Sequence, residues 1–282
     1  MIINTNVSSL TAQEAAKNTN NTLSSSLEKL STGLKINKAS DDASGLAIAD
    51  KLRTQATSIN QGVDNGNSAV TLLQIADKSM SEQSSILDTI KAKLIQANTA
   101  TTSTDGRNAI AGDVKKLLEQ LNNIAEQTNY NGTSLLQVSS TSTGIMTGLT
   151  FQIGESKADT IKVGAMQSNT AGLTLGALST AVTGNTLSRT GAASLQTNVD
   201  TAITKLNGFR AEIGSTQNQV ESAVRNLMTQ STNVTAAESI IRDVDYAQES
   251  ANFNKQNIIS QAGSYAISQA NTVQQNVLKL LQ

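Results

Sequence analysis

The stretch Ser31–Arg53, STGLKINKASDDASGLAIADKLR, separates two segments with helical patterning. Before it, four leucines at heptad spacing predict one apolar seam on a helix: Leu23, Leu27, Leu30 and Leu34. Gly33 is expected to loosen that helix. Ser40, Asp41 and Asp42 are N-cap candidates for a second helix, because a short side-chain oxygen can accept hydrogen bonds from a free first turn. The stretch therefore predicts a joint between two helices, and its spacing alone favours an ordinary helix–loop–helix corner.

The composition excludes several classes of catalytic site. The 282 residues include no Cys, His, Trp or Pro, and only 2% are aromatic. Without Cys there is no disulfide and no thiolate metal site, and without His neither imidazole–metal hydrolysis nor Ser-His-Asp catalysis is available. Few aromatic residues and no proline favour extended helices that bury their apolar stripes against other helices, in this chain or in others.

The remaining patterns give no sign of a cofactor, a nucleic-acid partner or an enzyme. The net charge is −1, and no run of 18 apolar residues predicts a membrane-spanning helix. The beginning of the sequence, MIINTNVSSLTAQEAAK, lacks the basic and apolar regions of a classical secretory signal. The tight acidic clusters, Asp41-Asp42 and residues 242–245, are more typical of a helix cap and a solvated turn than of acid–base or calcium sites.

Further along the chain, apolar periodicity predicts helices over residues 44–98, 107–127, 192–235 and 236–282. Gly62 and Gly66 are candidate interruptions of the first of these. Residues 129–132, NYNG, form a turn signal, and apolar residues alternate with polar ones over about 149–165, which predicts a β-hairpin. Residues 166–190 are small and polar, as in a flexible loop.

Several of these blocks closely resemble bacterial flagellins. The resemblance is carried by SGLKIN and DDASGLAIA in the joint, TNYNGTSLL after the second helix, the hairpin, FRAEIG, and IIRDVDYAQESANFNKQNIISQAGSYAISQANTVQQNVLKLL at the end. It covers roughly the first 165 and the last 90 residues. The chain departs from the family pattern at Gln274, where Pro is typical, and at Gln282, where Arg is frequent.

Together, the patterns and the resemblance imply a mainly α fold. The two ends of the chain would form long antiparallel helices that pair as a coiled coil, and a small β-hairpin would lie in the middle of the sequence. Residues 1–43 and 236–282 would form a terminal inner-core domain, and 44–165 with 191–235 a helical core domain containing the hairpin. Residues 166–190 would be a short variable loop.

The resemblance also implies a function: a structural subunit that polymerises into the flagellar filament, exported without a cleaved signal and placed outside the cell. Its partners would be copies of itself, cap and hook-junction proteins, and a secretion chaperone at the C-terminal segment. The expected joint residues are Gly33, Asn37, Asp41 and Asp42. The expected packing residues of the inner core are Leu23, Leu27, Leu30, Leu34, Ile258, Ala262, Ala266, Val273, Val277 and Leu281. The alternatives are a hook–filament junction protein of the same family, a surface adhesin, or a soluble helical enzyme, against which the missing His and Cys speak.

One stretch bears on recognition by an animal host. Flagellins that activate the Toll-like flagellin receptor typically carry Leu-Gln-Arg-Val-Arg-Glu-Leu-Ala-Val-Gln on the first core helix. The matching residues of this chain include Leu87, Thr89, Lys91, Ala92, Leu94 and Gln96. Thr89 stands where the family has the contacting Arg, and Ala92 stands at the acidic position. Because removing an Arg from a contact centre commonly costs about 2 kcal/mol or more, the resemblance implies weak or absent receptor activation.

Overall fold

The structure is a computed structural model that describes residues 5–137, 148–184 and 187–280. Residues 277–280 are described by their backbone alone. The chain divides into two compact units, one of residues 1–56 with 232–282 and the other of residues 57–231. The sequence placed the corresponding divisions at 43/44 and 235/236. Both divisions of the structure fall inside helices, at residues where the sequence carries no break.

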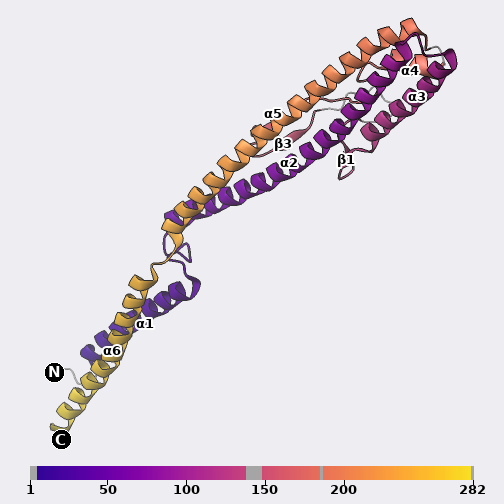
Figure 1. The fold of residues 1–282 in the computed structure, drawn as a ribbon. Coiled ribbons are helices and arrows are strands. Elements are labelled where there is room, and N and C mark those ends of the chain that lie inside the picture. The colour runs from indigo at the N-terminus through magenta and orange to yellow at the C-terminus, as the bar shows by residue number, and fades with distance from the viewer. Residues whose placement is uncertain (1–4, 138–147, 185–186, 281–282) are drawn as a thin grey trace. The chain divides into compact units, whose positions relative to one another are not determined.

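The first unit contains helices from both ends of the chain. Helix α1 (Val7–Thr32) leads through the joint into the beginning of α2 (Ala43–Asn98). The end of α5 (Arg189–Arg242) leads in turn into α6 (Tyr246–Leu280). Helices α1 and α6 lie side by side and run antiparallel, as the predicted pairing of the chain ends requires (Figure 1).

The second unit is built on three helices: the rest of α2, and α3 (Thr104–Gln127) and the first part of α5, both of which run antiparallel to α2 (Figure 1). Ion pairs join them, with Lys93 of α2 on Asp113 of α3 at 2.8 Å and Arg210 of α5 on Asp77 of α2 at 2.9 Å. The predicted helix 107–127 begins three residues earlier, because the Ser103 hydroxyl accepts from the Gly106 N–H and caps α3.

Two short hairpins complete this unit. Strands β1 (Asn129–Tyr130) and β2 (Thr133–Ser134) pair across the NYNG turn. Strands β3 (Thr150–Gln152) and β4 (Thr160–Lys162) form the predicted hairpin, and Phe151 faces Ile161 in the antiparallel register. The predicted class, mainly α with a small β-hairpin, is confirmed.

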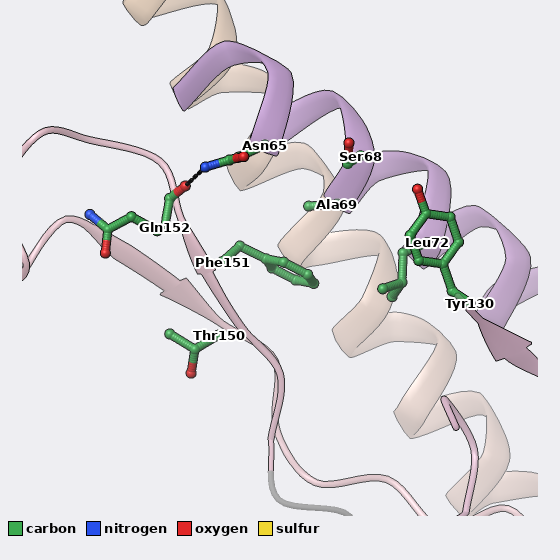
Figure 2. Close-up of a pocket in the computed structure, with 8 residues that line it drawn as sticks. All are labelled: Asn65, Ser68, Ala69, Leu72, Tyr130, Thr150, Phe151 and Gln152. Atoms are coloured by element: carbon green, nitrogen blue, oxygen red, sulfur yellow. Dashed lines mark hydrogen bonds between the residues drawn. The ribbon is translucent and has the colours of Figure 1, made fainter. Parts of the chain in front are cut away.

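Glycines 62 and 66 do not interrupt α2, contrary to the expectation. A Cβ on Gly62 would lie 1.8 Å from the Ile153 carbonyl oxygen, and a Cβ on Gly66 would lie 2.4 Å from Val224 Cγ2. The two glycines therefore let the hairpin and α5 approach the backbone of α2 closely. Figure 2 shows the same approach from the side of the hairpin, where the Asn65 amide donates to the Gln152 carbonyl at 3.0 Å.

Residues 166–190 differ most from the prediction of a flexible loop. They include a helix, α4 (Gly176–Thr183), which packs on α3. Their leucines are buried in the core of the unit: Leu173, Leu175, Leu178 and Leu187. The buried Gln83 of α2 holds the segment by donating to the Ser168 carbonyl at 3.2 Å and to the Leu121 carbonyl at 3.0 Å. The isolated leucines therefore belong to a packed segment, because all four join the same core cluster.

Candidate functional site

The α1–α6 pair is the first part of the candidate site, and its contact seam is made mainly of small residues. The least exposed positions of α1 repeat every three and four residues: Ser9, Ala12, Ala16, Thr19, Leu23, Ser26 and Leu30. The facing positions of α6 repeat in the same way: Phe253, Gln256, Ser260, Gly263, Ile267, Ala270 and Gln274. This is the spacing of a two-helix coiled coil.

Contacts along the seam confirm that the helices approach closely. A Cβ built on Gly263 would lie 3.8 Å from the Cβ of Ala16. On one side of this contact, the Ser260 hydroxyl donates to Asn20 Oδ1 at 2.9 Å. On the other side, the Asn6 amide donates to the Ala270 carbonyl at 3.1 Å. Polar groups thus hold the register of a seam that buries little large apolar surface.

The predicted leucine seam is only partly used within the chain. Leu23 and Leu30 lie in the α1–α6 seam, but Leu27 is 56% exposed, because Ser26 takes the seam position beside it. Leu34 lies beyond the end of α1 at Thr32 and belongs to the joint. The heptad spacing of the leucines was visible in the sequence. The small residues that share the seam, such as Ser26, carry almost no hydrophobic signal.

The outer face of α6 also carries large apolar side chains. Ile258 is 67% exposed, Tyr265 is 74% exposed and Val273 is 53% exposed. The expected packing residues Ala262 and Ala266 are exposed on the same outer side. Within the chain, therefore, none of Ile258, Ala262, Ala266 and Val273 packs on α1. Val277 and Leu281 lie outside the residues whose side chains the structure describes.

The joint after α1 is built by glycine and by capping carboxylates. Gly33 ends α1 in the left-handed conformation (φ 75°), and its N–H donates to the Lys29 carbonyl at 2.9 Å. Asp41 accepts from the Asn37 and Lys38 N–H groups at 3.1 and 3.0 Å. These two bonds lower the pKa of the Asp41 carboxyl, first through Lys38 and then through Asn37.

Of the three N-cap candidates, Asp42 caps α2. Its Oδ1 accepts from the Gly45 N–H at 2.9 Å, and its carbonyl accepts from the Leu46 N–H at 3.0 Å. Asp41 instead closes the preceding turn. The Ile36 side chain is buried beside the first turn of α2. Its Cδ1 lies 2.8 Å from where a Cβ on Gly45 would be.

A second joint, between α5 and α6, pairs with the first one. The Lys35 N–H donates to the Arg242 carbonyl at 2.6 Å, and the Val244 N–H donates to the Gly33 carbonyl at 3.0 Å. Asp245 then caps α6 by accepting from the Ala247 and Gln248 N–H groups at 2.9 and 3.2 Å, as expected for this acidic cluster. The sequence did not indicate this pairing, because the partners lie about two hundred residues apart.

The stretch compared with receptor-binding flagellins is only partly on the surface. Leu87 and Leu94 are fully buried in the core and Lys91 pairs with Asp200 at 2.5 Å. Five positions between Leu87 and Gln96 are exposed: Asp88, Thr89, Ala92, Ile95 and Gln96.

Two further features of the described residues bear on metal binding and on small-molecule binding. Among these residues, no three His, Cys, Asp or Glu side chains gather closely enough to hold a metal ion. An open pocket of about 270 Å³ lies between α2 and the β3–β4 hairpin, and Figure 2 shows that its lining has no carboxylate, amine or guanidinium group. In the part of the chain described here, no helix has the length and apolarity needed to cross a membrane.

One unit carries antiparallel terminal helices with apolar outer faces, and the other is made of long packed helices. These features define a helical structural subunit that can bury further surface against other helices. Comparison with known proteins gives the family. Residues 3–141 match the model of the bacterial flagellin N-terminal helical region, and residues 196–281 match that of the C-terminal helical region. The chain belongs to the bacterial flagellin family.

Relatives of full length support this assignment. The chain is 32% identical to a flagellin of Bacillus subtilis over 303 aligned residues that cover both chains completely. It is 35% identical to a flagellar filament 30.7 kDa core protein of Treponema maltophilum, again over the whole of both chains. A solved structure of a putative flagellar hook-associated protein from Vibrio parahaemolyticus shares the fold, with a TM-score of 0.59, 12% identity and coverage of 72% of this chain and 99% of that one.

Proposed function

We propose that this chain is the structural subunit of a bacterial flagellar filament, which serves swimming motility. The observation that carries the proposal is the outer face of the α1–α6 pair, where large apolar side chains stay in water while the seam consists mainly of small residues. Family membership supports it, since full-length relatives are named as flagellins and filament core proteins.

The outer faces of both terminal helices supply a driving force for assembly. On α1, Val7 is 63% exposed and Leu10 is 55% exposed, and α6 contributes Ile258, Tyr265 and Val273. Burying each large apolar side chain contributes about 1.5–3 kcal/mol. Copies that meet through such faces head to tail, without closing a ring, form a helical filament.

The test is polymerisation followed by electron microscopy. The full chain is compared with a version that lacks residues 1–35 and 245–282, and circular dichroism is recorded on the same samples. Long filaments from the full chain alone, with a rise in helicity, support the proposal. A full chain that stays monomeric under seeding conditions, with both ends already helical, contradicts it.

The same family reasoning extends to partners and location. We expect export through the flagellar route, assembly outside the cell, and contacts with cap and hook-junction proteins. A secretion chaperone would bind α6, whose apolar outer face provides a docking surface before assembly. Binding of a purified flagellin chaperone to the full chain, but not to the chain without residues 245–282, tests this.

A hook–filament junction role remains the alternative within the family. Sharing a fold with a hook-associated protein at 12% identity does not distinguish the two roles. The number of copies in an isolated filament does, because a junction protein forms only a short segment.

Recognition by the host flagellin receptor is expected to be weak. The exposed positions of the compared stretch include Thr89, where the resemblance expects a contacting Arg, and Ala92, where it expects an acidic residue. We expect Thr89→Arg, at an exposed site, to raise the activity of the purified monomer in a receptor reporter cell, whereas Gln96→Arg serves as the matched control. Full activity of the unmodified chain would contradict the expectation.

A further inference from the structure

Three Asn–Gly pairs occur in this chain, and the structure places them in three different environments. They are Asn65-Gly66, Asn131-Gly132 and Asn207-Gly208. The first pair lies inside α2, the third inside α5, and the second forms the loop between β1 and β2. An asparagine followed by glycine is the dipeptide whose side chain is most easily reached by the next backbone nitrogen, because glycine has no Cβ in the way.

The loop pair has the freedom that this reaction needs. The ladder pairs Tyr130 with Thr133 and Asn129 with Ser134, so Asn131 and Gly132 lie outside it. Both loop residues are exposed, and both have positive φ, 49° and 79°. A Cβ on Gly132 would meet nothing within 4 Å, so no other part of the chain crowds its Cα from that side.

The helical pairs are held in different ways. Gly66 is buried, and the Asn65 side chain accepts from Gln61 Nε2 at 3.1 Å and donates to the Gln152 carbonyl at 3.0 Å (Figure 2). Asn207 and Gly208 are exposed, and a Cβ on Gly208 would also meet nothing within 4 Å. The third pair is thus as open as the loop pair, but its backbone amides are committed to the helix ladder.

We propose that Asn131 is a site of spontaneous covalent modification, deamidation through a cyclic imide with Gly132. The Gly132 nitrogen attacks Cγ of Asn131, the N–Cγ bond forms, and the Cγ–Nδ2 bond breaks. The amide proton of Gly132 leaves with Nδ2 as ammonia. Water then opens the imide at either carbonyl, which yields aspartate when the new bond breaks and isoaspartate when the original peptide bond breaks. Solvent water is the only co-reactant, and no electrons are transferred.

The two products have different consequences for the hairpin. Aspartate keeps the two-residue loop, and Asp-Gly suits this turn as well as Asn-Gly does. Isoaspartate inserts one more carbon into the main chain of the loop, so the pairing of Tyr130 with Thr133 is lost. The hairpin directly precedes the buried Leu135, whose N–H donates to the Thr128 carbonyl at 3.1 Å. The damage therefore reaches the edge of the core.

The experiment incubates the folded full-length chain in mildly alkaline buffer and follows each pair by peptide mass mapping, with separation of aspartate from isoaspartate. We expect Asn131 to react at least about tenfold faster than Asn207, because reaction inside a helix requires local unfolding. Asn65 is expected to be slower still. The same chain in denaturant provides the control, where the three pairs should react at similar rates.

Two variants sharpen the test. Gly208→Ala, which suits a helix and meets open space, should remove the signal at Asn207 and leave that at Asn131 unchanged. Asn131→Asp should fold and keep the hairpin while showing no mass change at this site. The proposal is overturned if Asn207 reacts as fast as Asn131 in the folded chain, or if Asn131 stays intact there while it reacts in denaturant. The measurement uses the monomer, so its outcome does not depend on filament formation.

Discussion

Replacing Ile258 by alanine tests whether the outer face of α6 joins subunits together. Ile258 is 67% exposed in the isolated chain, so about two-thirds of its side chain remains available for burial. Since full burial of such a side chain is worth about 1.5–3 kcal/mol, the substitution should cost assembly about 1–2 kcal/mol per subunit. Every 1.4 kcal/mol is a factor of ten, so the critical concentration should rise roughly fivefold to thirtyfold.

The assay is seeded polymerisation, in which the concentration of chain left in the supernatant after sedimentation gives the critical concentration. Circular dichroism of the monomer should be unchanged, because alanine is a strong helix former and the Ile258 side chain is largely exposed. Gln261→Ala, at an exposed position one turn further on, is the matched control. Ile267→Ala, in the seam, should instead reduce the helicity of the monomer.

The reasoning fails if Ile258→Ala polymerises at the same critical concentration as Gln261→Ala. It fails equally if the loss of assembly is accompanied by a loss of monomer helicity, because the residue would then support the fold instead of the contact between copies.

Further predictions concern the joint, the seam and the core. Gly33→Ala should destabilise the terminal unit by about 1–2 kcal/mol from the left-handed conformation alone, and a Cβ there would also lie 3.0 Å from the Tyr246 hydroxyl; faster amide exchange in α6 would report it. Gly263→Ala should instead slow that exchange, with a gain of about 1 kcal/mol, because its Cβ meets only an ordinary contact. The pKa of Asp41 lies below its ordinary value of 3.8, so its stabilising effect is present above pH 3.8 and is lost as the pH falls through the lower folded pKa; a joint whose amides lose protection already above pH 3.8 contradicts this. Leu178→Ala should destabilise the core unit by about 2–5 kcal/mol in urea unfolding, and an unchanged midpoint would mean that α4 does not pack as described.

The long helices could be predicted because each carries its own periodic signal. Ile110, Val114, Leu118 and Leu121 recur at three and four residues, and all four are buried in the structure. The end signals were local as well: Asp42 caps α2 and Gly33 ends α1 within the stretch that indicated a joint. Such features depend on residues within a turn or two of one another, so a single sequence displays them.

Features that depend on distant partners could not be predicted. In the sequence, Gly62 is typical of a helix interruption. In the structure it makes room for the Ile153 carbonyl, which comes from a residue 91 positions later in the sequence. Similarly, the bond from Lys35 to the Arg242 carbonyl joins two turns, each of which appears complete by itself. The leucines of residues 166–190 looked isolated because no helical or strand period connects them, although all four join one core cluster.

The α1–α6 seam shows a more general difficulty. Hydrophobic patterning favoured the large aliphatic residues of both terminal helices as the contact between them, but Ser26 lies in the seam while Leu27 is exposed, and Gly263 lies in it while Ile258 is exposed. Small residues allow two helices to approach closely, yet they bury little apolar area, so the pair is weakly stabilised by its own contact. The larger side chains on the outside gain their burial only when other helices cover them. A terminal unit with this distribution should be marginally stable as a monomer and should gain much of its order from association, which is why the exposed face, and not the seam, is the place where single substitutions should control assembly.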